Sequence, residues 1–255
     1  GRHKMPLCPQ KYKRKIDTPG GFREMTILRP LCITLGQGRF NKLSIRIDRF
    51  IVNRTAKRLK TRPDIIYSHF WKAANNIIDF AVENGIPSFV ATGEDEITID
   101  QFLSPQRISL LKDNMKGVIC VSTKNQTEGI AYHLTELSKT IVLPNAVNPK
   151  EFYHIGQKAA REQLGYSQDD FIVAYCGRFN TRKGCRRVSD AITLLNDPQI
   201  KSIFIGIASG GIHEEPACEG ILFKGSLNHH EIVTYLNAAD VFVLPTQAEG
   251  CSNAI

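Results

Sequence analysis

The sequence lacks the features that mark several large classes of protein. It has no run of about 18 apolar residues, which is the length that a membrane-spanning helix needs. Its seven cysteines form no Cys-x-x-Cys pair, and it has no Asp-x-Asp pair. It opens on Gly1-Arg2-His3-Lys4 without the apolar stretch of a secretory signal. We therefore expect no membrane span, disulfide framework or zinc site, and a reducing, cytoplasmic compartment.

Acidic residues are scarce in the first quarter of the chain. Residues 1–62 hold 17 Lys or Arg against 3 Asp or Glu, whereas the whole chain of 255 residues has a net charge of +8. A basic segment attracts polyanions such as anionic lipid headgroups or nucleic acid. No nucleic-acid motif accompanies it, and aromatic residues are sparse there. The segment is either a solvated basic face or a peripheral contact with the inner face of an anionic membrane.

The order of apolar runs predicts an α/β fold in two parts. Residues 1–24 read as loop, and residues 25–28 as a short strand. Residues 43–59 read as an amphipathic helix whose apolar side carries Leu43, Ile47, Phe50, Ile51 and Leu59. From residue 64 onward strands and helices alternate, which is typical of parallel sheets with helices on both faces. The stretch 144–154 is the expected linker. We predict two incomplete Rossmann-like domains, residues 1–148 and 149–255.

Two patches near the carboxyl end of the chain suggest chemistry. Gly177, Arg178 and Lys183 follow a short apolar run that reads as a buried strand. Ligands bind at the carboxyl ends of strands in open α/β sheets, and a guanidinium with an ammonium suits a diphosphate. Glu249 follows a second such strand. A carboxylate there repels phosphates, but it can accept hydrogen bonds from sugar hydroxyls.

Six motifs in order resemble the retaining glycosyltransferases of the GT-B fold, family 4. They are Asp64-Ile65-Ile66-Tyr67-Ser68-His69-Phe70, Gly117-Val118-Ile119-Cys120-Val121-Ser122, Leu143-Pro144-Asn145-Ala146-Val147-Asn148, Gly177-Arg178 with Lys183-Gly184, Ala238-Ala239-Asp240-Val241-Phe242-Val243-Leu244-Pro245, and Glu249-Gly250. The family's second Glu would fall at position 257, and its glycine-rich loop near the amino terminus is not visible. The resemblance therefore also implies an internal fragment of a longer enzyme.

The resemblance assigns roles to single residues. Arg178 and Lys183, with Gly177, would hold the donor's diphosphate, and Glu249 would position the transferred sugar. Asn145 would contact the donor. His69 ends a strand on the side of the site, and Glu94 stands where many members carry a His, so it could act as the general base. The implied reaction moves a sugar from a nucleotide diphosphate sugar to a glycan or lipid-linked glycan, with retention and without a metal ion or other cofactor.

Each of these residues also has a plainer interpretation. His69 could be packed, Glu94 could cap the next element or face solvent, and Asn145 could stabilise a turn. Arg182, Arg186 and Arg187 read as a solvated helix face. At the level of the protein, the alternatives are a non-catalytic nucleotide-sugar-binding or scaffolding protein and another GT-B enzyme such as a nucleotide-sugar epimerase.

Overall fold

The chain divides into two compact units between Pro144 and Asn145. The predicted boundary was four residues later, after residue 148. The computed structural model describes residues 10–18, 21–30, 41–99, 103–209 and 212–254. Each unit holds its own four-stranded parallel sheet, so the predicted α/β class is confirmed. None of the helices in the described ranges is long and apolar enough to cross a bilayer.

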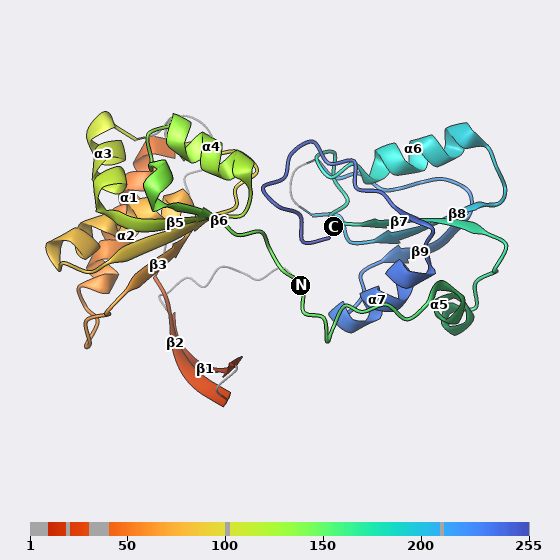
Figure 1. Cartoon of the computed structure of the whole chain (residues 1–255), viewed down its shortest axis with the longest axis horizontal. Coiled ribbons are helices and arrows are strands. Elements are labelled where there is room, and N and C mark those ends of the chain that lie inside the picture. Colours follow the sequence, from red (N-terminus) through yellow and green to blue (C-terminus); the bar gives the residue numbers. More distant parts are fainter. Residues whose placement is uncertain (1–9, 19–20, 31–40, 100–102, 210–211, 255) are drawn as a thin grey trace. The chain divides into compact units, whose positions relative to one another are not determined.

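The first unit begins with a β-hairpin that the sequence did not predict. Strand β1 (Gln10–Thr18) pairs antiparallel with β2 (Gly21–Arg29) (Figure 1). The expected loop at 1–24 is therefore wrong over 10–18 and 21–24, while the strand predicted at 25–28 lies within β2. Residues 1–9 and 19–20 lie outside the described part of the chain. Most described side chains of the hairpin are exposed. Because most side chains of both strands are exposed, the sequence shows no regular alternation of apolar and polar residues here. That alternation is the signal from which a half-buried strand is predicted.

Helix α1 (Asn41–Ala56) buries a side that overlaps only in part with the one expected, since Ile47 and Ile51 are half-buried. Ile45 is 8% exposed, whereas Leu43 and Phe50 are 47% and 64% exposed. The side chain of Asn53 fixes this orientation by donating to the carbonyl of Asn76 at 2.6 Å and accepting from the amide of Phe80 at 2.8 Å. Both partners belong to α2 (Phe70–Glu83). These two hydrogen bonds thus fix the rotation of α1, a helix with few apolar residues.

The sheet of the first unit has the strand order β3-β4-β5-β6, and its parallel strands alternate with helices. Trp71 and Ile78 of α2 pack with Val90 and Val118 of the sheet in one core. On the sheet itself, Tyr67 and Ile141 are more than half exposed. The remaining elements of this unit are β3 (Ile66–His69), β4 (Ser88–Thr92), α3 (Pro105–Asn114), β5 (Met115–Cys120), α4 (Thr123–Ala131), the 3₁₀ helix η2 (Leu137–Lys139) and β6 (Thr140–Val142).

The second unit is a three-layer structure around the strand order β10-β7-β8-β9. Helix α6 covers one face of this sheet, and α5 and α7 cover the other (Figure 1). The strand β7 serves both cores, because Tyr175 packs with the residues of α6 and Ala174 with those of α7. The elements are α5 (Gln157–Leu164), β7 (Phe171–Cys176), α6 (Cys185–Leu195), β8 (Ile200–Ile205), β9 (Ile221–Gly225), α7 (His229–Ala238) and β10 (Val241–Phe242).

Candidate functional site

A cavity of about 510 Å³ lies in the second unit, where β7 ends. Gly177, Arg178, Lys183 and Glu249 all line it, so four of the residues singled out in the sequence come together there. Strand β7 lies between β10 and β8 and is buried along most of its length. The cavity thus opens at the carboxyl end of an inner strand, which is where α/β sheets bind their ligands.

The backbone at Gly177 is closely packed against Tyr175. A Cβ at this position would lie 3.0 Å from the hydroxyl oxygen of Tyr175. That hydroxyl donates to the carbonyl of Arg178 at 2.8 Å. Burial raises the pKa of the Tyr175 phenol well above its usual value, so this donor keeps its proton. Tyr175 therefore holds the backbone of Arg178 in place while the Arg178 side chain stays exposed at the cavity.

Lys183 is positioned by a turn that leads into α6. The side chain of Asn180 accepts from the amide of Lys183 at 3.0 Å, and Asn180 is only 4% exposed. Gly184 follows at φ +77°, and a Cβ there would lie 2.6 Å from the carbonyl oxygen of Pro245. Only glycine fits this left-handed, crowded position. Sequence reasoning missed Asn180, although a polar residue three positions before a site lysine could have drawn attention to it.

The ammonium group of Lys183 forms an ion pair with the carboxylate of Glu249. The two side chains are 16% and 21% exposed. An ammonium has three donors, so one bond to Glu249 leaves two for a ligand oxygen. With Arg178, the three charged groups leave one net positive charge facing the cavity. Arg178 and Lys183 can therefore bind an anionic group of a ligand, while the Glu249 carboxylate accepts hydrogen bonds from a neighbouring polar group of the same ligand.

The loop that carries Glu249 is tied down by two arginines that we had interpreted as a solvated helix face. Arg182 donates to the carbonyl of Ala248 at 3.2 Å, and Arg187 donates to that of Pro245 at 2.6 Å. The prediction was wrong for Arg182, whose side chain is half-buried against the Ala248 carbonyl. Arg187 is exposed as expected, but it also bonds with the loop. Arg186 does lie on the exposed side of α6, where it pairs with Asp190 at 2.7 Å.

Asn145 bonds with the same loop rather than stabilising a turn of its own. Its amide nitrogen donates to the side-chain oxygen of Asn253 at 2.6 Å and to the carbonyl of Cys251 at 3.2 Å. Cys251 and Asn253 line the cavity, whereas Asn145 is not among its lining residues. The structure therefore places Asn145 one contact away from the cavity.

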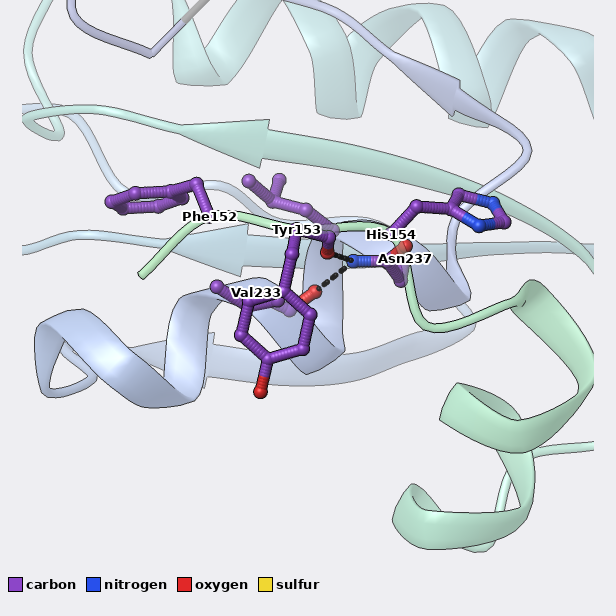
Figure 2. Close-up of a pocket in the computed structure, with 6 residues that line it drawn as sticks. Phe152, Tyr153, His154, Val233 and Asn237 are labelled. Atoms are coloured by element: carbon purple, nitrogen blue, oxygen red, sulfur yellow. Dashed lines mark hydrogen bonds between the residues drawn. The ribbon is translucent and has the colours of Figure 1, made fainter. Parts of the chain in front are cut away.

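The segment expected as a linker is fastened to the second unit beyond Asn145. Figure 2 shows Asn237 of α7 donating to the carbonyls of Tyr153 and Val233, at 3.1 and 2.8 Å. Asn237 also accepts from the amide of Ile155 at 3.2 Å. These bonds border a second hollow of about 360 Å³, which shares Phe152 with the larger cavity. The polar atoms of Asn237 are thus occupied by backbone groups.

His69 and Glu94 lie in the first unit. His69 is exposed at the end of β3, with its ring 5.9 Å from that of Tyr67 and 5.3 Å from that of Phe70. Phe70 has φ +69°, an outlier for an aromatic residue, which makes the turn from β3 into α2 unusually sharp. Nothing in the sequence signals this strained residue.

The carboxylate of Glu94 caps α2. One oxygen accepts from the amide of Trp71 at 2.8 Å, and the other accepts from Thr92 at 2.6 Å and from Gly93 at 2.9 Å. Desolvation first, and then the Glu94 charge, raise the pKa of Cys120 to about 11. Three hydrogen bonds favour a structural role, and the helix that Glu94 caps precedes it in the sequence rather than following it.

Comparison with known proteins finds a family model that matches most of the second unit. The family model described as "Glycosyl transferases group 1" matches residues 156–254. TuaC of Bacillus subtilis (strain 168), assigned to teichuronic acid biosynthesis as a glycosyltransferase, is 27% identical over 210 residues, which are 80% of this chain and 52% of TuaC. Alpha-galactosylglucosyldiacylglycerol synthase of Streptococcus pneumoniae is 30% identical over 126 residues, 44% of this chain and 33% of that enzyme. The chain thus spans about half the length of the first of these relatives, and less of the second.

Solved structures agree on the fold. Sucrose-phosphate synthase from Thermosynechococcus elongatus superposes with a TM-score of 0.66 at 19% identity, covering 90% of this chain and 62% of that one. HepE from Anabaena in complex with UDP gives 0.58 at 18% identity, covering 83% and 59%. Residues 156–254 therefore match the family model of group 1 glycosyltransferases, and the fold of the chain is that of GT-B glycosyltransferases.

Proposed function

We propose that this chain belongs to a glycosyltransferase that moves a sugar from a nucleotide diphosphate sugar to a hydroxyl of a glycan or lipid-linked glycan, with retention at the anomeric carbon. The observation that carries the proposal is the convergence of Arg178, Lys183 and Glu249 on one cavity where β7 ends. The UDP complex of HepE supports a nucleotide diphosphate donor. The two curated relatives support a polysaccharide or glycolipid acceptor.

The chemistry follows from the charge that develops on the leaving group. As the glycosidic bond breaks, the nucleoside diphosphate gains negative charge, which fixed cations stabilise more in the transition state than in the ground state. Arg178 faces the cavity without an ion pair to any described residue. Lys183 is held by Glu249 and keeps two donors for a phosphate oxygen. We expect these cations, rather than a metal ion, to serve the diphosphate.

Glu249 would then serve the sugar. A carboxylate paired with Lys183 lies beside the diphosphate position without adding an unbalanced negative charge. Its free oxygen can accept a sugar hydroxyl. The basic first segment of the chain would keep the protein in peripheral contact with the inner face of a membrane, near a lipid-linked acceptor.

The proposal is tested on the full protein by calorimetric titration with UDP and by a screen of UDP-sugars. We expect Lys183→Ala to weaken UDP binding and to lower turnover at least tenfold, because charge-assisted contacts are worth about 1.5–3 kcal/mol each. Arg186→Ala is the matched control, since it removes one positive charge from the exposed side of α6. Equal UDP affinity for the wild type and Lys183→Ala would remove the phosphate role.

The ion pair requires one further variant. Removing Lys183 also leaves the Glu249 carboxylate uncompensated, and that carboxylate alone could repel UDP. The double variant Lys183→Ala with Glu249→Gln removes both charges. If it restores wild-type UDP affinity, Lys183 serves only to neutralise Glu249. We expect the loss of affinity to remain.

A further inference from the structure

The β1–β2 hairpin sorts its side chains by face. Residues that pair across an antiparallel ladder lie on the same face, and the faces alternate along each strand. Tyr12 pairs with Ile27, Arg14 with Met25, and Ile16 with Arg23. These positions, together with Arg29, share one face, which we call the arginine face: Tyr12, Arg14, Ile16, Arg23, Met25, Ile27 and Arg29.

The arginine face is cationic and apolar at once. It holds three arginines and, among the hairpin side chains that the structure describes, no acidic residue. Tyr12 and Met25 are 36% and 38% exposed, and Arg29 lies over the ring of Tyr12 at 5.2 Å. Two partly exposed apolar side chains thus lie among the three arginines of this face.

The opposite face has a different chemistry. Lys11, Lys13 and Lys15 lie there with Glu24, and Lys13 pairs with Glu24 at 3.0 Å. We call it the lysine face. Two basic groups, one within α1 and one just after it, are used in a similar way, because Arg49 pairs with Asp79 at 3.7 Å and Lys57 with Glu83 at 2.6 Å. Part of the positive charge of the first segment is thus compensated within the unit, whereas no ion pair between described residues compensates the arginine face.

We propose that the arginine face docks on an anionic lipid bilayer. Arg14, Arg23 and Arg29 would bind lipid phosphates, while Tyr12 and Met25 enter the headgroup region. Arginine forks fit phosphate oxygens, and tyrosine rings favour the boundary between water and hydrocarbon. Apolar residues between the cations favour a bilayer over a soluble polyanion, which offers them nothing to enter. The inference rests on the proposed function in one respect, since a lipid-linked acceptor would lie at that surface.

The test compares two variants of equal charge. Arg14→Gln/Arg23→Gln/Arg29→Gln removes three positive charges from the arginine face, and Lys11→Gln/Lys13→Gln/Lys15→Gln removes three from the lysine face. Each full-length protein is sedimented with vesicles of phosphatidylglycerol and phosphatidylcholine, and with phosphatidylcholine alone. We expect the arginine variant to lose at least tenfold in partitioning to the anionic vesicles and the lysine variant at most threefold. Equal losses would indicate long-range attraction without a docking face and overturn the proposal.

A second pair of measurements tests the apolar part. Tyr12→Ser/Met25→Ser keeps every charge, so a soluble sulfated polysaccharide should bind it as it binds the wild type. Its partitioning to anionic vesicles should fall at least threefold. Unchanged vesicle binding would assign the hairpin to polyanions and overturn the bilayer proposal. UDP affinity should stay at the wild-type value in all three variants, so loss of docking and failure of the donor site are told apart.

Discussion

At the scale of the residue, the charge of Glu249 has opposite effects on Lys183 and on the proposed diphosphate. It compensates Lys183, yet its charge opposes the diphosphate that Lys183 would bind. We expect Glu249→Gln to leave UDP affinity unchanged or to raise it, and to lower turnover with the matching UDP-sugar at least tenfold. Calorimetry and a product-release assay separate the two effects. A parallel fall in both would mean that Glu249 supports the cavity instead of contacting the sugar.

Asp240 shows a residue whose role is structural although it lies in one of the family-like motifs. It pairs with Arg161 at 2.6 Å and accepts from the amide of Ile172 at 2.6 Å, and the Arg161 side chain is 3% exposed. Removing one partner of a buried pair leaves an uncompensated charge. Asp240→Asn should therefore lower the free energy of unfolding by about 3 kcal/mol.

The matched control for Asp240 is Asp190→Asn. It breaks the pair with Arg186, whose side chains are 51% and 53% exposed. Exposed pairs contribute at most about 1 kcal/mol, so urea unfolding should barely change. Similar midpoints for the two variants would contradict a buried role for Asp240.

At the scale of the element, the start of α2 depends on Glu94. Three hydrogen bonds from Trp71, Thr92 and Gly93 end on its carboxylate. We expect Glu94→Ala to destabilise the first unit by about 1–2 kcal/mol, which is the usual cost of losing a cap. Thermal unfolding measures this cost.

A second substitution at Glu94 distinguishes its role as a helix cap from a role as general base. Glu94→Gln keeps two acceptor lone pairs on one oxygen but cannot take up a proton at neutral pH. It should retain part of the stability lost in the alanine variant. If turnover collapses in the glutamine variant while the melting temperature holds, Glu94 is a base and our structural interpretation of it is wrong.

The elements show how far the sequence could be read. The bounds of β4, α3 and α7 agree with the pattern, because their apolar residues face a core and their ends carry capping or turn residues such as Asn228. The hairpin could not be found this way, since most of its described side chains are exposed and none of them faces a core cluster. The face of α1 was set by Asn53, a contact that no periodicity reveals.

The candidate site was predictable to a similar degree. Gly177, Arg178, Lys183 and Glu249 could be found because they follow apolar strands, whose carboxyl ends meet at one edge of the sheet. Arg187, which helps to hold the loop of Glu249, could not, because only the fold brings the Pro245 carbonyl near it. Asn180 could have been found, since it lies only three positions before Lys183. Supporting contacts of this kind leave little trace in sequence.

At the scale of the whole molecule, the two units have separate cores and separate sheets. A ligand of the cavity binds groups of the second unit only, so it should stabilise that unit alone. At a concentration about 100 times its dissociation constant, the gain is about 2.7 kcal/mol. Differential scanning calorimetry of the full protein with UDP should show one transition that moves up and one that stays. Equal shifts of both would mean that the units unfold together.

The place of β10 beside β7 has a consequence for biosynthesis. Strand β7 gains its neighbour on one side only when Val241 and Phe242 of β10 have been synthesised, some seventy residues later. A ribosome releases a chain from its amino end, and domains usually fold as they emerge. The first unit can therefore fold before Asp240, the partner of Arg161 and of the Ile172 amide, has been synthesised. Stalled translation in that interval would leave an open apolar strand edge, and nascent chains of this length should depend most on chaperones.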